Sequence, residues 1–326
     1  MICFNNAMRI IALEEHITTP ELLKARAQAW QAAPSMQALG GKLLDLGDGR
    51  IADMDAAGID VQVLSPAAND LDKLQPTTAN ALARDTNDVL AAAVRAHPKR
   101  FAAFATLALQ DPENAAAELQ RCIGQLGFKG VMVSGTIGGR FLDDARFTPL
   151  FETAQALDVP IYLHPAPPPQ AVLDAYFSGL PGDLGFLLST AGWGWHVETG
   201  MHSLRLIISG VFDRFPRLKI ILGHMGENLP FSIARADAVF ARGPKQLQRR
   251  VAEYFYEHFY ITTSGYFTAP PFLCALQVIG ADRILFSVDY PFSSNNVGRN
   301  FLDNLSVSSG DMEKISHRNA ERLLEL

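Results

Sequence analysis

The chain has 326 residues, of which 48% are apolar and only 19% are charged, so it can bury a large core. The net charge of -6, without a cluster of lysine and arginine, argues against a nucleic-acid partner. No apolar stretch approaches the roughly 20 residues that span a bilayer, so we expect no membrane segment. The three cysteines are far apart and odd in number, which excludes a disulfide framework and favours a reducing, cytoplasmic setting.

Short apolar runs alternate with amphipathic segments along the whole chain. Eight runs have the composition of strands, at residues 9–14, 59–65, 101–107, 129–134, 160–164, 217–223, 258–263 and 283–288. Helical patterns fill the gaps, and Asp111 followed by Pro112 is a typical helix start. No Gly-x-Gly-x-x-Gly phosphate turn is present, so the rhythm favours a closed α/β barrel of the (β/α)8 TIM type over a doubly wound sheet.

Two connections are longer than simple turns between a strand and a helix. Residues 22–49 follow the first strand, and residues 165–192 follow the fifth and are rich in proline and glycine. A long insertion after a strand that carries ligands is typical of a substrate lid or a subunit contact. No repeat divides the chain, so we predict one barrel domain over residues 1–326, with residues 1–8 as an N-terminal extension.

Four of the predicted strands end on side chains that bind metals or move protons. These side chains are Glu14 and His16, His164, His224, and Asp289. Barrel enzymes form their active sites where the strands end, so the four strands would deliver these groups to one mouth. Glu14 and His16 are two residues apart and therefore lie on the same side of the strand, with Glu15 on the other. Mixed carboxylate and imidazole ligands suit Zn, Mn or Fe(II).

The other histidines are interpreted as structural. His258 opens a strand at the bottom of the barrel, where residues usually serve stability. His196 and His202 lie on the segment after the proline-rich insertion, and of the two we consider only His202 as an outer partner of the site.

Five short motifs contain or adjoin the candidate residues. They are ALEEH at 12–16, YLHP at 162–165, ILGHMGE at 221–227, TTSG at 262–265 and ILFSVDYP at 284–291. Together they resemble the amidohydrolase superfamily. More narrowly, they resemble its decarboxylase branch, which includes γ-resorcylate, 2,3-dihydroxybenzoate, 5-carboxyvanillate and aminocarboxymuconate-semialdehyde decarboxylases. The resemblance runs from residue 9 to 326 and also implies a homodimer or homotetramer.

By this resemblance, one divalent metal, Zn or Mn, is held by four ligands: Glu14, His16, His164 and Asp289. Binuclear hydrolases of the superfamily bridge two metals with a lysine at the end of the fourth strand. In this chain Lys129 stands at the start of that strand, which favours a single metal.

The resemblance also implies roles around the metal. His224 and Glu227 are similar to the branch's catalytic pair, in which Glu227 orients the histidine or helps to shuttle protons. Arg50 matches an arginine that binds a substrate carboxylate, and Arg235, eight residues after Glu227, is a second candidate for that pocket. The loop at residues 136–148 would wall the ring pocket.

The predicted reaction is non-oxidative decarboxylation of an aromatic, ortho-hydroxybenzoate-like or conjugated carboxylic acid. The metal would bind the substrate's oxygens, and Asp289 would protonate the ring carbon if burial raised its pKa. Hydrolysis of a lactone, amide or unsaturated ring by metal-activated water is the alternative. A third interpretation is a non-catalytic, metal-binding barrel.

Overall fold

The computed structural model describes residues 8–25, 34–66, 71–243 and 247–326. Most of the predicted N-terminal extension and the middle of the first long connection lie outside these residues. In the described part of the chain, no helix is long and apolar enough to cross a membrane.

The eight predicted strands are all present in the described residues, in chain order. They are β1 (Ile11–Ile17), β2 (Val61–Pro66), β3 (Phe101–Ala103), β4 (Val131–Ser134), β5 (Ile161–His164), β6 (Ile220–Leu222), β7 (Phe259–Thr262) and β8 (Ile284–Leu285). The first three strands and the last five pair in parallel with their neighbours in sequence. Single parallel bridges, Leu13 to Ser287 and Ala105 to Val131, join the two groups at both edges. The sheet is therefore a closed barrel, and the predicted fold is confirmed.

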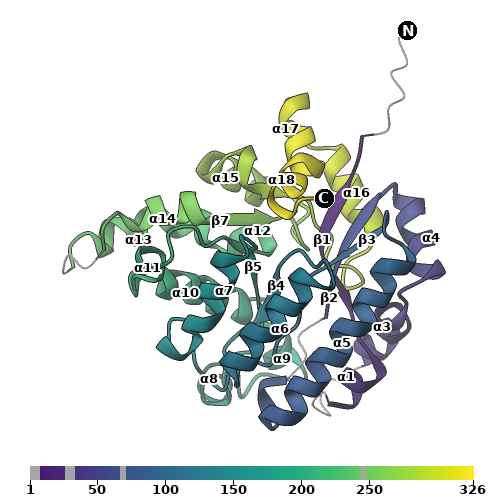
Figure 1. Ribbon diagram of the computed structural model, residues 1–326. Helices are drawn as coiled ribbons and strands as arrows, with labels where there is room; N and C mark the ends of the chain where they lie inside the picture. The colour runs from purple at the N-terminus through teal and green to yellow at the C-terminus, as the bar shows by residue number, and fades with distance from the viewer. Residues whose placement is uncertain (1–7, 26–33, 67–70, 244–246) are drawn as a thin grey trace.

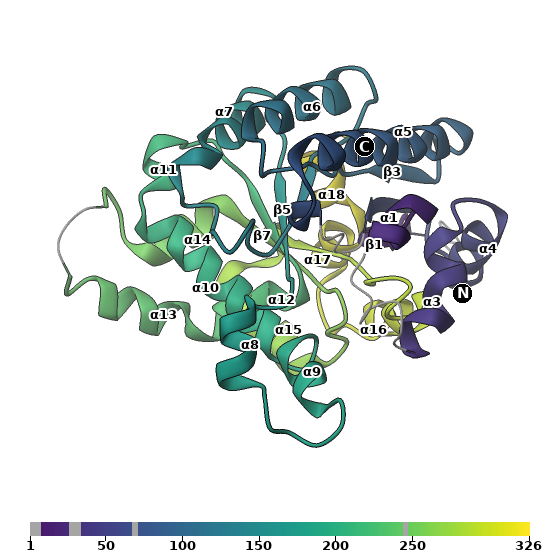
Figure 2. The ribbon, with the colours of Figure 1, turned by 90° about the horizontal axis from the view of Figure 1, so that it is seen from below.

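Helices surround this barrel (Figures 1 and 2). Before β5 the chain forms α1 (Pro20–Ala25), α3 (Pro34–Leu44), α4 (Asp48–Ala57), α5 (Pro76–Ala96), α6 (Pro112–Gly124) and α7 (Thr148–Ala156). After β5 it forms α8 (Gln170–Tyr176), α9 (Leu184–Ser189), α10 (Gly194–Ile208), α11 (Val211–Arg214), α12 (His224–Glu227), α13 (Leu229–Phe240) and α14 (Val251–His258). The C-terminal part adds α15 (Ala269–Ile279), α16 (Asn295–Asp303), α17 (Ser309–Glu313), a π-helical turn at Lys314–Arg318, and α18 (Asn319–Leu324).

The strands separate two apolar layers because successive side chains point to opposite faces. Ile161 and Leu163 of β5 pack outward in the cluster that contacts the helices, whereas Tyr162 between them belongs to the barrel interior. Met132 on β4 fills the same interior layer. This filled interior is a packed core and no pore, and the candidate ligands lie at the ends of the strands.

The long connection after β5 contains two short helices, α8 and α9, before the chain enters α10. In Figure 2 these two helices and the loop between them project from one side of the body. They carry large apolar side chains in solvent, including Tyr176 at 76% exposure and Leu184 and Leu187 at 54% each.

Candidate metal centre and active site

The end of β1 departs from a regular strand, and this departure places Glu14. The pairing of β1 with β2 shifts register between Ala12 and Glu15, and Glu14 has a φ of 62°. Such a bulge re-aims one side chain. Glu14 and His16 therefore lie together, as predicted, but through a bulge and not through simple alternation. Glu15 turns away and accepts hydrogen bonds from the backbone N–H groups of Val288 and Tyr290, at 2.9 and 3.2 Å.

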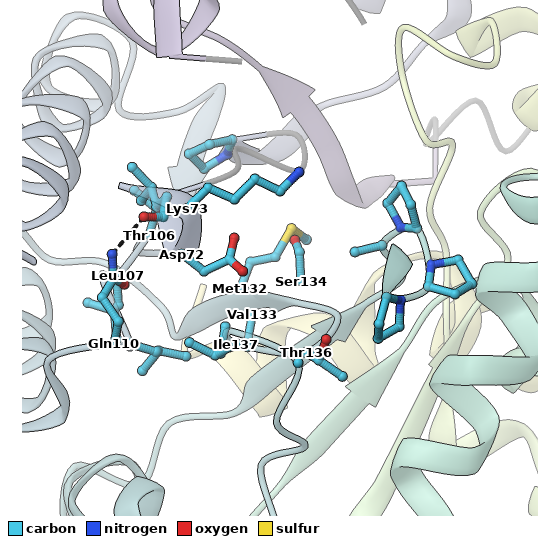
Figure 3. Close-up of a pocket in the computed structure, with 18 of the residues that line it drawn as sticks. Asp72, Lys73, Thr106, Leu107, Gln110, Met132, Val133, Ser134, Thr136 and Ile137 are labelled. Atoms are coloured by element: carbon cyan, nitrogen blue, oxygen red, sulfur yellow. Dashed lines mark hydrogen bonds between the residues drawn. The ribbon is translucent and has the colours of Figure 1, made fainter. Parts of the chain in front are cut away.

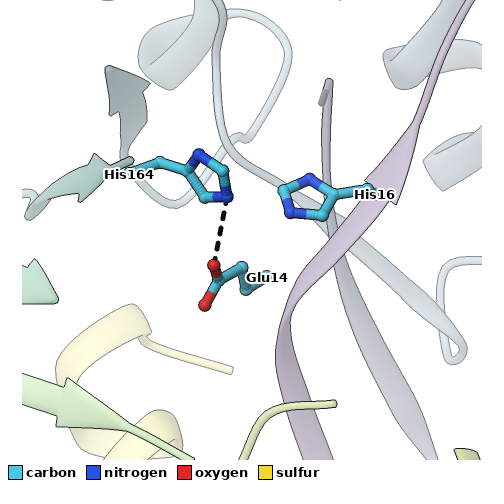
Figure 4. Close-up of side chains that lie close together, drawn as sticks. All are labelled: Glu14, His16 and His164. Atoms are coloured by element: carbon cyan, nitrogen blue, oxygen red, sulfur yellow. Dashed lines mark ion pairs between the residues drawn. The ribbon is translucent and has the colours of Figure 1, made fainter. Parts of the chain in front are cut away.

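Side chains from β1 and from the ends of β5 and β8 form one buried cluster. The Nε2 atom of His164 lies 3.2 Å from Oε1 of Glu14 (Figure 4). Nε2 of His16 lies 3.3 Å from Oδ1 of Asp289. His224 at the end of β6 completes the group, with Nε2 at 3.6 Å from Oε1 of Glu14. The strand ends thus bring together every residue that was expected to bind the metal.

Two atoms of this cluster fit a bound cation. Oε1 of Glu14 and Nε2 of His16 are buried and form no hydrogen bond. A buried polar atom without a partner is costly, and a metal ion would satisfy both atoms at once. Glu14, His16 and His164 present ligand atoms within 4.8 Å of one another, and so do Glu14, His224 and Asp289. The donor set of oxygen and nitrogen can hold one divalent metal.

The other oxygen of Glu14 is held by hydroxyl groups. Tyr162, Thr262 and Ser264 all donate hydrogen bonds to Oε2. These bonds fix the carboxylate so that Oε1 faces the imidazoles. Partners of this kind orient a metal ligand and raise its affinity for the ion. Sequence reasoning did not identify them, although Thr262 and Ser264 lie in the TTSG motif.

Burial and neighbouring charged groups shift the pKa values of the site in opposite directions. Burial alone would raise the pKa of Asp289, but the imidazoles of His16 and His224 beside it outweigh burial and hold this pKa below its ordinary value. Burial opposes protonation of His224, yet the carboxylates of Glu14 and Glu227 raise its pKa well above the usual range. The pKa of Asp289 is therefore lowered here, whereas the expected role of Asp289 as the acid needs a raised one.

A third histidine joins the pair that the sequence suggested. Nδ1 of His224 lies 2.7 Å from Oε1 of Glu227, and Nδ1 of His196 lies 2.6 Å from Oε2 of the same carboxylate. His196 is 3% exposed, so the whole array is buried. The interpretation of His196 as purely structural overlooked this contact, because it is 31 residues from Glu227 in sequence. His202 instead accepts a hydrogen bond from the N–H of Leu142.

Arg50 is fully buried, and its guanidinium group is occupied by the protein itself. It donates to the backbone oxygens of His16 (2.7 Å), Lys42 (3.1 Å) and Asp45 (2.8 Å), and to the side chain of Gln62 (3.1 Å). This placement gives Arg50 the task of bracing the backbone at a predicted metal ligand. It does not support the expectation that Arg50 binds a substrate carboxylate.

The other two basic residues considered from the sequence also lie apart from the cluster. Arg235 is exposed on α13, so a single chain does not bring it into the cluster. Lys129 donates to the backbone oxygen of Glu325 at 2.9 Å, on the C-terminal segment. This position agrees with the absence of a bridging lysine from the mouth.

A cavity of about 370 Å³ lies at the ends of β2 to β5 (Figure 3). Its walls include Pro66, Met132, Ser134 and Ala166. None of the candidate metal ligands is among its lining residues, but Ser134 pairs with His164 in the sheet and Pro66 follows Ser65, which pairs with His16. Thr136, Ile137 and Gly139 of the loop at residues 136–148 also line it. The volume is in the range of pockets for small molecules.

Several residues of the site have backbone conformations that non-glycine residues rarely adopt. The φ angles are 62° at Glu14, 50° at His224, 53° at Glu227 and 69° at Asp289. Each costs of order 1–3 kcal/mol, and such conformations cluster at functional sites. These conformations therefore lower the free energy of unfolding, and they set the directions of the four side chains at the mouth of the barrel.

The family model described as amidohydrolase matches residues 41–326, and the chain belongs to that family. Its sequence is 42% identical to a γ-resorcylate decarboxylase from Polaromonas sp. strain JS666, over 97% of this chain and 98% of that protein. It is 38% identical to the decarboxylase orsB of Emericella nidulans, over 97% of each chain.

Two solved structures of decarboxylases have the same fold as this chain. A 2,6-dihydroxybenzoate decarboxylase complexed with 2,6-dihydroxybenzoate superposes with a TM-score of 0.90 at 40% identity, covering 98% of this chain and 100% of that one. A dihydroxybenzoic acid decarboxylase from Polaromonas, with bound manganese and the inhibitor 2-nitroresorcinol, also gives a TM-score of 0.90. It is 41% identical and covers 98% of this chain and 97% of that one.

Proposed function

We propose that this protein is a metal-dependent, non-oxidative decarboxylase of an ortho-hydroxybenzoate-like acid. The observation that carries the proposal is the placement of Glu14, His16 and His164, with Asp289 next to His16, beside the His224–Glu227 pair. The first four are the proposed ligands of one Zn or Mn ion, and the pair is the proposed proton-handling group. The similarity to γ-resorcylate and 2,6-dihydroxybenzoate decarboxylases supports this substrate class.

A bound divalent metal would hold the carboxylate and ortho-hydroxyl oxygens of the substrate and withdraw charge from the ring. Decarboxylation consumes one proton, because a carboxylate leaves as carbon dioxide and hydrogen takes its place. Nε2 of His224 faces Oδ2 of Asp289 at 3.8 Å, so these two groups share the proton destined for the ring carbon. Protonation first avoids an aryl anion, and the electron pair of the breaking C–C bond restores aromaticity.

A panel of hydroxybenzoates and conjugated dicarboxylates, assayed for carbon dioxide release alongside metal analysis, tests the proposal. In deuterium oxide, the product should carry one deuterium at the carbon that lost its carboxylate. A hydrolase acting through metal-activated water would instead place solvent oxygen-18 in a product carboxylate or alcohol. Oxygen-18 incorporation without carbon dioxide release would reject the decarboxylase in favour of the hydrolase.

We also propose that the chain assembles as a homodimer or homotetramer through α8 and α9. The exposed apolar residues of this surface, which we call the insertion patch, are Tyr176, Leu180, Leu184, Phe186 and Leu187. A second copy of the same chain suits it because a symmetric contact pairs one apolar surface with itself. A cytoplasmic location is proposed from the free thiols of Cys122 and Cys274.

A further inference from the structure

We propose that His196 is a positioning residue that acts through Glu227 to hold His224 in the reactive tautomer. The inference rests on the proposed function for its kinetic readout, although the geometry stands by itself. The carboxylate of Glu227 lies between two buried imidazoles, at 2.7 Å from Nδ1 of His224 and 2.6 Å from Nδ1 of His196. A carboxylate only accepts hydrogen bonds, so each imidazole must donate its Nδ1–H.

This donation decides which nitrogen of His224 takes part in chemistry. With Nδ1–H committed to Glu227, Nε2 is the nitrogen that gives or receives a proton, and it is the one that faces Glu14 and Asp289. A base whose second nitrogen is held by an orienting group is the arrangement of catalytic triads. Here the orienting carboxylate is itself held, because His196 fixes the oxygen that His224 does not use.

His196 is anchored in turn by the end of the long insertion. Its Nε2 atom lies 3.2 Å from the indole N–H of Trp195 and 3.1 Å from the backbone oxygen of Ala191. With Nδ1–H donated to Glu227, the neutral ring accepts the indole hydrogen at Nε2, and the oxygen of Ala191 is then a neighbouring atom and not a hydrogen-bond partner. Both ring nitrogens are therefore satisfied, and the imidazole is held in one orientation.

The backbone of α10 shows a second, independent adaptation to Glu227. A Cβ atom at Gly200 would lie 2.6 Å from the backbone oxygen of Glu227, so only glycine allows the helix to approach this closely. Glycine inside a helix costs roughly 1 kcal/mol relative to alanine. His196 and Gly200 are four residues apart and share one face of the helix. One face of α10 thus holds both the side chain and the backbone of Glu227.

The test compares two amides at position 196. In His196→Asn the side-chain NH₂ reaches the place of Nδ1 and can still donate to Glu227, whereas in His196→Gln it reaches the place of Nε2. We expect H196Q to lose about 10–100-fold in kcat, with unchanged KM and metal content, and H196N to retain most of the activity. Gly200→Ala should also lower kcat while the metal stays bound, because it displaces α10 from Glu227.

The same two amides at His258, a buried histidine at the bottom of the barrel whose Nδ1 contacts the backbone oxygen of Leu218, are the matched control and should leave kcat unchanged. Equal losses at 196 and 258, or equal kcat in H196N and H196Q, would reduce His196 to a packing residue.

Crystal structures of H196N and H196Q give a readout that needs no activity. In H196Q the Glu227 carboxylate should rotate and its contact with Nδ1 of His224 should lengthen, while H196N should keep both. An unmoved pair in H196Q overturns the inference. If the wild-type protein releases no carbon dioxide from any acid of the panel, the proposed function fails, and the crystal structures still decide the role of His196.

Discussion

The hydroxyl group of Tyr162 donates a hydrogen bond to Oε2 of Glu14 across the interior of the barrel. The same bond orients Oε1 of Glu14 toward the imidazoles, and Oε1 itself forms no hydrogen bond. Tyr162→Phe keeps the packing of the ring and removes only this donor. We expect the affinity for the metal to fall about 10–100-fold, measured by competition with a chelator. An unchanged affinity would mean that Thr262 and Ser264 alone orient the carboxylate.

The proposed ligand role of His164 predicts a loss of metal on truncation. His164→Ala removes the nitrogen that lies 3.2 Å from Glu14 at the mouth of the barrel, where side chains contribute little to the core. The variant should lose most of the one equivalent of metal that we expect in the wild-type protein, by elemental analysis, and remain folded by circular dichroism. Full occupancy in the folded variant would exclude His164 as a ligand.

His224→Asn separates proton handling from metal binding. The asparagine amide can still donate to Glu227 from the position of Nδ1, but no atom replaces Nε2. We expect the metal to be retained and kcat to fall by about 10²-fold or more. A parallel loss of metal would instead make His224 a ligand, which its 3.6 Å distance from Glu14 would then explain.

Because His202 is buried, we expect the stability of the folded chain to fall at acid pH. Burial lowers its pKa from 6.5 to about 3 in the folded chain. Between these two values the unfolded chain binds the proton and the folded chain does not, so stability falls as the pH drops from about 6.5 toward 3. The slope is at most about 1.4 kcal/mol per pH unit. His202→Gln, which can still accept from Leu142 but does not titrate, should flatten this part of the profile in urea unfolding experiments.

If the insertion patch joins copies of the chain, negative charges placed on the patch should disrupt the assembly. Leu184→Glu combined with Leu187→Glu places two carboxylates on a surface that we expect to be buried between copies. Light scattering should show a smaller particle than the wild type. The matched control is Leu273→Glu, because Leu273 is 48% exposed on α15, away from the patch. A wild-type monomer, or an assembly that tolerates both charges, would contradict the proposal.

The sequence predicts the strands and the candidate ligands because both depend on local patterns. An apolar run that ends on Glu14 and His16, His164 or Asp289 needs no knowledge of distant residues once a barrel is inferred. Parallel strands with their carboxyl ends at one mouth then bring the groups together. The bulge in β1 is not visible in these patterns, but Glu14 and His16 still lie together at the mouth.

Contacts between residues far apart in sequence depend on the three-dimensional fold, and the sequence patterns do not predict them. His196 contacts Glu227 because α10 packs against α12. The guanidinium group of Arg50 instead donates to backbone oxygens, among them that of His16, 34 residues away in sequence. The direction of the pKa shift at Asp289 likewise follows from which imidazoles lie beside it. Hydrogen bonds and charges act over a few ångströms in space, and the sequence specifies the chemical groups without specifying those distances.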